Sequence, residues 1–124
     1  MEFPDGLYYT KEHEWLSSDS GEATIGVTSY AVDQLGDIVH VDLPNVGDEF
    51  EEGESFGTIE STKTVSDLYM PSNGKVIEVN EHVLNNPEGI QDSPYDAGWL
   101  VKVELSAPAK LLEASEYEEY TKES

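Results

Sequence analysis

Short apolar runs separated by Gly, Pro, Asn and Asp recur along the chain, and this punctuation is typical of an all-β fold. One run alternates between Asp37 and Leu43, where Val39 and Val41 fall on the face opposite His40, which predicts a strand buried on one side. Strands are predicted at 22–28, 37–43, 65–70, 75–80 and 99–105. Singly spaced glycines divide the stretch between the second and third of these into further short strands.

Two helices are predicted among the strands. Thr28 or Ser29 caps the start of a short internal helix that Gly36 ends. A C-terminal helix is predicted over about 107–122, because apolar residues recur there at three-residue steps and form one stripe. The members of this stripe are Leu111, Ala114, Tyr117 and Tyr120.

Two connecting segments have compositions that predict their conformation. The stretch 84–98 is rich in Asn, Pro, Asp and Gly, which predicts a surface loop. The sequence "PSNG" at 71–74 predicts a turn in which Asn73 and Gly74 can adopt positive φ.

A lysine occupies the tip of one predicted hairpin. The residues from Ser61 to Thr64 are small and polar, as a tight turn requires, and they separate a strand ending near Glu60 from one starting near Val65. Lys63 is therefore expected to be exposed, with its amine pointing away from the sheet. A primary amine on a rigid turn suits the attachment of a prosthetic group, because a modifying enzyme can reach it and the turn fixes its direction. Such a group would supply chemistry that side chains lack.

Composition narrows the partners and the compartment. The 124 residues suit one domain spanning 1–124, and the 27 acidic and 6 basic side chains give a formal charge of −21. A chain so acidic cannot neutralise a row of phosphates or bind an anionic membrane, so neither nucleic acid nor a membrane is expected as a partner. There is no cysteine, no signal-peptide pattern and no apolar segment long enough to span a bilayer, which predicts a cytoplasmic protein.

The chain lacks the usual sequence patterns of an enzyme. His13, His40 and His82 have no second histidine at metal-ligand spacing. No Gly-rich phosphate loop, calcium loop or nucleophile elbow is present. We therefore expect neither a metal site nor catalysis by the chain alone.

From about Leu7 to Tyr120 the sequence resembles the H proteins of the glycine cleavage system, which are lipoyl carriers. The family pattern around the modified lysine is Glu-Ser-x-Lys-x-x-Ser-Asp, which Glu60, Ser61, Lys63, Ser66 and Asp67 match. Thr62 and Thr64 flank the lysine where the family commonly has Val and Ala. The matching blocks are "HEW" (13–15), "ATIGVTSYA" (23–31), "LGDIVHVDLP" (35–44), "GESFGTIESTKTVSDLY" (53–69), "GKVIEVN" (74–80) and "SPYDAGWLVKVEL" (93–105).

The resemblance implies a barrel-sandwich hybrid of the lipoyl/biotinyl-domain type, with a core over about 22–105 and lipoate amide-linked to Lys63. It also implies a monomer that is modified by a lipoate-attaching enzyme and then visits three others. Glycine decarboxylase would load an aminomethyl group, aminomethyltransferase would pass it to tetrahydrofolate, and dihydrolipoyl dehydrogenase would reoxidise the arm. By the same resemblance, Glu14 and Asp67 would hold the cationic cargo in a cleft, and Glu12 would make that cleft more acidic than usual.

Other functions remain open at this point. A biotin carrier has the same fold, although such proteins typically place the lysine between methionines rather than between threonines. An H-like protein could relay lipoate to other complexes. An acidic β domain with an unmodified Lys63 and a small hydrolase that uses the histidines are the remaining alternatives.

The acidic residues are spread over the whole sequence, which is typical of a surface adapted to high salt rather than of one docking face. Screening lengths fall to about 3 Å at 1 M salt, where the repulsion among these charges becomes small. We therefore expect the melting temperature, measured by calorimetry, to rise with KCl into the molar range. A melting temperature that stays flat or falls would contradict this interpretation.

Overall fold

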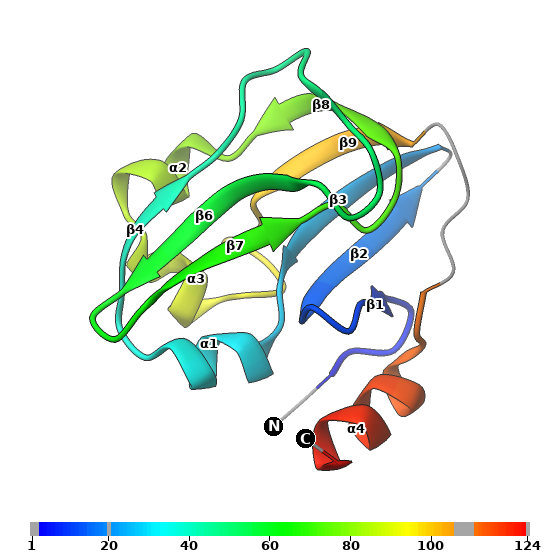
Figure 1. Cartoon of the computed structure of the whole chain (residues 1–124), viewed down its shortest axis with the longest axis vertical. Helices are drawn as coiled ribbons and strands as arrows, with labels where there is room; N and C mark the ends of the chain where they lie inside the picture. Colours follow the sequence, from blue (N-terminus) through cyan, green and yellow to red (C-terminus); the bar gives the residue numbers. More distant parts are fainter. Residues whose placement is uncertain (1–2, 20, 106–110, 124) are drawn as a thin grey trace.

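The computed structural model describes residues 3–19, 21–105 and 111–123, and the strands in this part of the chain form two antiparallel sheets (Figure 1). The larger sheet has the order β1 (Tyr8–Tyr9), β2 (Glu14–Asp19), β3 (Glu22–Val27), β9 (Val101–Leu105), β8 (Gly74–Val79) and β5 (Glu49–Phe50). The smaller sheet has the order β4 (Ile38–Asp42), β6 (Ser55–Ser61) and β7 (Val65–Tyr69). The five predicted strands correspond to β3, β4, β7, β8 and β9, whereas β1 and β2 were not predicted.

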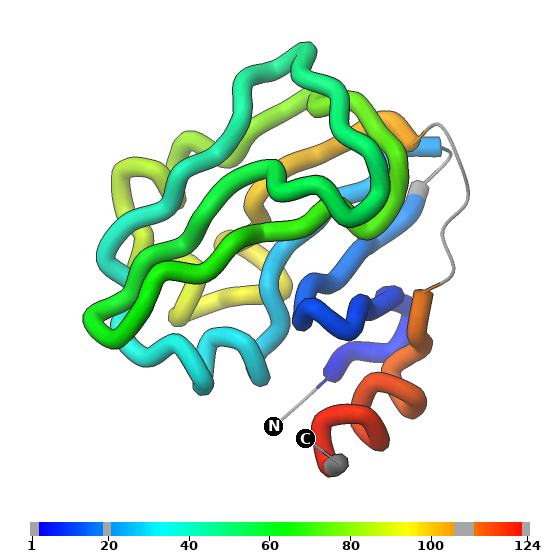
Figure 2. Tube along the Cα trace, in the orientation of Figure 1, coloured from blue at the N-terminus to red at the C-terminus, as the bar shows by residue number. Residues whose placement is uncertain are grey.

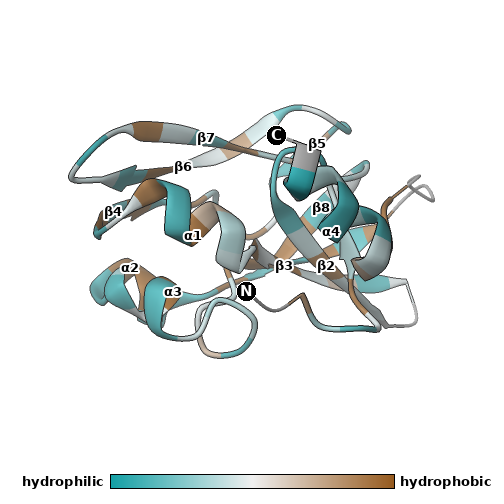
Figure 3. Cartoon of the chain, turned by 90° about the horizontal axis from the view of Figure 1, so that it is seen from below, coloured by the Kyte–Doolittle hydropathy of each residue, from teal (hydrophilic) through white to brown (hydrophobic). Residues whose placement is uncertain are grey.

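The main core lies between the two sheets, which Figure 3 shows as separate layers. Ile25, Val76 and Val103 point into it from the larger sheet, and Val41 and Ile59 from the smaller one, and all five are buried. The burial of these branched apolar side chains away from water is the main contribution to the free energy that holds the two layers together.

The internal helix α1 (Ser29–Leu35) begins and ends as predicted. Thr28 is its N-cap: the Thr28 hydroxyl oxygen accepts a hydrogen bond from the Ala31 N–H at 3.2 Å. Gly36 ends the helix with φ of 82°, a conformation that favours glycine, and its N–H donates to the Val32 carbonyl.

The C-terminal helix is shorter than predicted. Of the expected span 107–122, residues 107–110 lie outside the described residues, and α4 runs from Ala114 to Glu123. Leu112 is extended rather than helical, because its N–H and carbonyl pair with those of Tyr9 at 2.8 and 2.7 Å. Ala114 and Tyr117 are buried in a second, aromatic cluster, so the predicted apolar stripe is confirmed within α4 itself.

The prediction of a loop at 84–98 is wrong in its first half. Two short helices, α2 (Glu81–Asn85) and α3 (Glu88–Asp92), cover this region. Val83 and Ile90 are fully buried in the main core, and this tertiary burial outweighs the local preference of a polar, Gly- and Pro-containing sequence for a loop. None of the described helices is long and apolar enough to cross a membrane.

Two details of the strand predictions also need correction. The alternation predicted for 37–43 is interrupted by a β-bulge between Ile38 and His40, so Ile38 is buried and Val39 is half exposed. At the 71–74 turn, neither Asn73 nor Gly74 adopts positive φ. Gly74 instead begins β8, where an added Cβ would lie 3.1 Å from a backbone oxygen of β9.

Candidate functional site

Lys63 lies at the exposed tip of the hairpin that joins β6 to β7, as the sequence predicts. This tip projects beyond the rest of the smaller sheet (Figure 2). Its base is anchored to the neighbouring segment, because the Thr62 N–H donates to the Asp37 carbonyl at 3.0 Å. The lysine is therefore accessible to another protein while its backbone is held in place.

Ser61 is the residue that makes this turn rigid. It is 6% exposed, and its hydroxyl oxygen accepts hydrogen bonds from the backbone N–H groups of Lys63 and Thr64 at 3.2 and 3.1 Å. The Ser61 N–H in turn donates to the Thr64 carbonyl at 2.8 Å. A short side chain that satisfies the turn in this way explains why a serine suits this position.

The Lys63 side chain extends toward the end of α1 rather than straight into solvent. A Cβ added to Gly36 would lie 3.3 Å from Lys63 Cε and 3.6 Å from its Nζ. The amine therefore lies beside the C-terminal end of α1, whose partial negative charge favours a cation. Gly36 suits this position because of its positive φ, and its lack of a side chain leaves room beside the Lys63 stem.

A small cleft of about 120 Å³ opens between α1, the Thr10–Glu14 segment and β7. It brings together three carboxyl residues proposed from the sequence, Glu12, Glu14 and Asp67, and also Ser66 of the lysine motif. The rest of its wall is mainly apolar and includes Val27, Ala31, Leu35, Ile59 and Leu68.

Glu14 connects the two sheets at this cleft. Its side chain is 1% exposed, and its Oε2 accepts a hydrogen bond from the Tyr69 N–H on β7 at 2.7 Å. Its Oε1 accepts from the Thr10 hydroxyl at 3.2 Å. A β2 side chain thus satisfies a backbone donor of β7, which is one of the two edge strands of the smaller sheet.

Burial raises the pKa of Glu14 to about 8. Desolvation is the largest cause, and the nearby Glu12 adds to it, while the bonds from Tyr69 and Thr10 act in the opposite direction. The Glu14 carboxyl group is consequently protonated in most molecules at neutral pH when no cation lies beside it.

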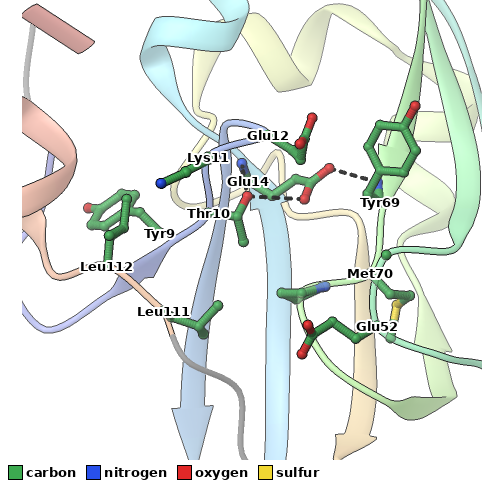
Figure 4. A pocket seen from close by; sticks show the side chains of 12 residues that line it. Tyr9, Thr10, Lys11, Glu12, Glu14, Glu52, Tyr69, Met70, Leu111 and Leu112 are labelled. Carbon is green, nitrogen blue, oxygen red and sulfur yellow. Dashed lines mark hydrogen bonds between the residues drawn. The ribbon is translucent and has the colours of Figure 1, made fainter. Parts of the chain in front are cut away.

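A larger cleft of about 430 Å³ lies on the other side of Glu14 (Figure 4). Tyr9, Leu111 and Leu112 line one wall, and Tyr69 and Met70 line the opposite one. Thr10, Glu12 and Glu14 lie between these walls. Glu12 and Glu14 line both clefts, so this short segment separates them.

The other proposed site residues differ in their surroundings. Asp67 is exposed, and its carboxylate oxygens lie 3.5 Å from the Ser55 hydroxyl and 3.4 Å from the Tyr69 hydroxyl. Glu12 and Glu60 are also exposed. Among these carboxyl groups, Glu14 alone combines deep burial with two accepted hydrogen bonds.

The histidines lie in three different environments. His13 contacts the aromatic cluster, His40 forms an exposed pair with Asp42 at 3.1 Å, and His82 belongs to α2. Within residues 3–19, 21–105 and 111–123, no three His, Cys, Asp or Glu side chains gather in a way that could hold a metal ion.

Three residues of this site were not found from the sequence. Thr10, Tyr69 and Gly36 contact Glu14 or Lys63, yet each belongs to a type that is common in turns and strands. Gly36 was identified only as a helix end, and the positions of Thr10 and Tyr69 depend on long-range packing. The match of Tyr69 to a family block was the only signal available for either of these two.

Comparisons with known proteins find similar proteins over nearly the whole chain. The family model described as "Glycine cleavage H-protein" matches residues 7–124. The chain is 50% identical to the glycine cleavage system H protein of Staphylococcus saprophyticus over 98% of this chain and 96% of the relative. It is also 50% identical to the glycine cleavage system H protein of Symbiobacterium thermophilum, over 97% of this chain and 96% of that relative.

A solved structure confirms the fold. The crystal structure of a glycine cleavage system H protein from Mycobacterium marinum superposes with a TM-score of 0.90 at 43% sequence identity, covering 98% of both chains. The predicted all-β, barrel-sandwich hybrid fold is thereby confirmed.

The raised pKa of Glu14 predicts a specific dependence of stability on pH. Because the folded chain binds this proton more tightly than the unfolded one, whose glutamate pKa is near 4.5, the stabilisation is complete below pH 4.5 and is lost as the pH rises through about 8. Between pH 6 and pH 8 the free energy of unfolding should fall by about 2 kcal/mol relative to Glu14→Gln. Urea titrations of both proteins measure this difference, and parallel pH profiles would contradict it.

Proposed function

Because this chain belongs to the glycine cleavage H-protein family, we propose that it is a carrier whose Lys63 bears a lipoyl group. The carrier would shuttle the aminomethyl group of glycine between the enzymes of that system. The observation that carries this proposal is the placement of Lys63 at a rigid, exposed hairpin tip within the motif Glu60-Ser61-x-Lys63-x-x-Ser66-Asp67.

The proposed partners follow from the same function. A lipoate-attaching enzyme would modify Lys63, and a pyridoxal-phosphate glycine decarboxylase would load the carrier. A tetrahydrofolate-dependent aminomethyltransferase would unload it, and dihydrolipoyl dehydrogenase would reoxidise it. The chain would act in the cytoplasm as a monomeric substrate of these enzymes rather than as an enzyme.

The residues around Lys63 fit a lipoyl group. The amine is accessible, its stem already lies beside Gly36, and the nearby small cleft offers the apolar side chains of Ala31 and Leu35 to a hydrocarbon arm. A bound lipoyl group would supply reversible thiol–disulfide chemistry, which a chain without cysteine lacks.

Glu14 and Glu12, which line the small cleft, would bind the cationic aminomethyl group. An ammonium group beside Glu14 favours the ionised carboxylate, so the cation would displace the proton of Glu14 and gain a charge-assisted hydrogen bond. Asp67 would add negative charge from β7. The apolar walls would limit the access of water to the cargo.

Intact mass tests the attachment directly. Protein made in a host that supplies lipoate and its attaching enzyme should gain the mass of one lipoyl group. Lys63→Arg, which keeps the positive charge but lacks a primary amine, should gain none, and Lys75→Arg is the matched control because it leaves Lys63 intact. A biotinyl increment, no increment, or an increment that survives Lys63→Arg would overturn the proposal.

Glu14→Gln tests the role of the buried carboxyl group. The amide oxygen can still accept from the Tyr69 N–H, so the contact between the sheets is kept while the negative charge is lost. We expect the isolated, loaded carrier to lose its aminomethyl group about tenfold faster, since one charged hydrogen bond is worth about 1.5–3 kcal/mol. Release of formaldehyde measures this rate, with Glu54→Gln as a distant control, and an unchanged rate would exclude Glu14 from cargo binding.

A further inference from the structure

The segment that separates the two clefts is a short turn from Thr10 to Glu14, between β1 and β2. Its backbone is closed by two hydrogen bonds, from the Thr10 N–H to the Glu14 carbonyl at 2.9 Å and from the His13 N–H to the Thr10 carbonyl at 3.1 Å. The turn carries Glu12 and Glu14, the two carboxyl residues that line both clefts. The position of this turn therefore sets the position of both acids.

His13 adopts a strained conformation in this turn. Its φ is 68°, and it is the non-glycine residue with positive φ among those the structure describes. A side chain in this region costs free energy and persists only where its surroundings hold it. Here the His13 carbonyl accepts from the Thr28 N–H at 3.0 Å, and its ring packs against Tyr30 and Tyr117.

The Tyr117 hydroxyl joins three elements at this point. It lies 2.7 Å from His13 Nδ1 in the turn and 2.8 Å from the hydroxyl of Thr28, the N-cap of α1. Tyr117 is fully buried in α4, and its ring stacks on Tyr9 of β1 at a centroid distance of 4.8 Å. One hydroxyl thus connects the C-terminal helix, the acidic turn and the helix that ends beside Lys63.

The directions of these hydrogen bonds follow from the available donors. The Thr28 hydroxyl accepts from the Ala31 N–H, and among the described residues its remaining partner is Tyr117. Being buried, Thr28 must donate its proton to the Tyr117 oxygen, and Tyr117 then donates to His13 Nδ1. Burial lowers the pKa of His13 and raises that of Tyr117, so both groups are neutral and match these roles.

We propose that Tyr117 is a positioning residue for the small cleft lined by Glu12, Glu14 and Asp67. Tyr117 holds the Thr10–Glu14 turn in place through His13 and Thr28. In this arrangement the Tyr117 hydroxyl keeps His13 at positive φ, and the chain direction that follows from this φ directs Glu14 into the gap between β2 and β7. The expected effect on retention of the aminomethyl group rests on the proposed carrier function, but the role of Tyr117 in the turn can be tested on the unmodified protein.

The state of His13 in the unmodified wild-type protein is the first test. Imidazole ¹⁵N chemical shifts at neutral pH should show a neutral ring with the proton on Nε2 and with Nδ1 as a hydrogen-bond acceptor. A protonated Nδ1 would overturn the proposal, and this measurement requires no variant to fold.

The second test compares two tyrosines of α4. Tyr117→Phe removes the shared hydroxyl but keeps the ring that stacks on Tyr9. Tyr120→Phe is the matched control, because the Tyr120 hydroxyl also reaches this turn, at the Lys11 carbonyl, but only through an exposed 3.4 Å contact. Among the described residues it is the Tyr117 hydroxyl that bonds to His13 and Thr28. Carboxyl ¹³C NMR titrations of the unmodified proteins follow Glu14 in each.

We expect Tyr117→Phe to lower the pKa of Glu14 by at least about one unit toward its usual value, because a loosened turn admits water to the carboxyl group. Tyr120→Phe should leave that titration unchanged. A simple loss of stability would not move this pKa in the folded state. An unchanged Glu14 titration in Tyr117→Phe, or an equal change in Tyr120→Phe, would overturn the proposal.

The consequence for the carrier is measured separately on lipoylated, loaded protein. Tyr117→Phe should speed the loss of the aminomethyl group severalfold, as Glu14→Gln does, and Tyr120→Phe should not. If Lys63 proves to carry no lipoyl group, the proposed function fails, whereas the two NMR measurements still decide the role of Tyr117.

Discussion

The hydrogen bond from the Tyr69 N–H to the buried Glu14 carboxyl group is the contact on which the site depends. The two sheets share one apolar core, but along the border between β2 and β7 they are not joined by strand pairing. Glu14 crosses this border and satisfies a backbone donor of an edge strand. The same side chain separates the small cleft from the large one, so the shape of both clefts depends on it.

This contact also decides how the site handles charge. The chain carries a formal charge of −21, yet Glu14, the most buried carboxyl group among the described residues, is protonated in most molecules at neutral pH, because desolvation outweighs its hydrogen bonds. In the proposed carrier, negative charge would form at Glu14 when a cationic cargo arrives. The exposed acids, such as Glu12 and Asp67, set the surrounding potential without any comparable desolvation cost.

Hydrogen bonds and packed side chains hold both the turn that carries Lys63 and the Thr10–Glu14 turn that carries the acids. Ser61 fixes the turn that presents Lys63, and Gly36 leaves room for the lysine stem beside α1. The aromatic rings of α4 and β1 pack together and hold the Thr10–Glu14 turn in place. A flexible arm attached at Lys63 would therefore move between surfaces that are themselves held in place.

Local chemistry was enough to predict several features. Small polar residues at 61–64 place Lys63 at a hairpin tip, and Thr28 and Gly36 mark the two ends of α1. Both could be predicted because turn and cap preferences act over a few residues. The burial of Ile90, the bulge at Val39 and the extended Leu112 could not be predicted, since each depends on partners far along the chain. The sequence by itself thus determined the family, the lysine and its turn. Only the tertiary structure decided that Glu14 is buried against Tyr69 and that Tyr117 reaches His13, because long-range packing brings these residues together.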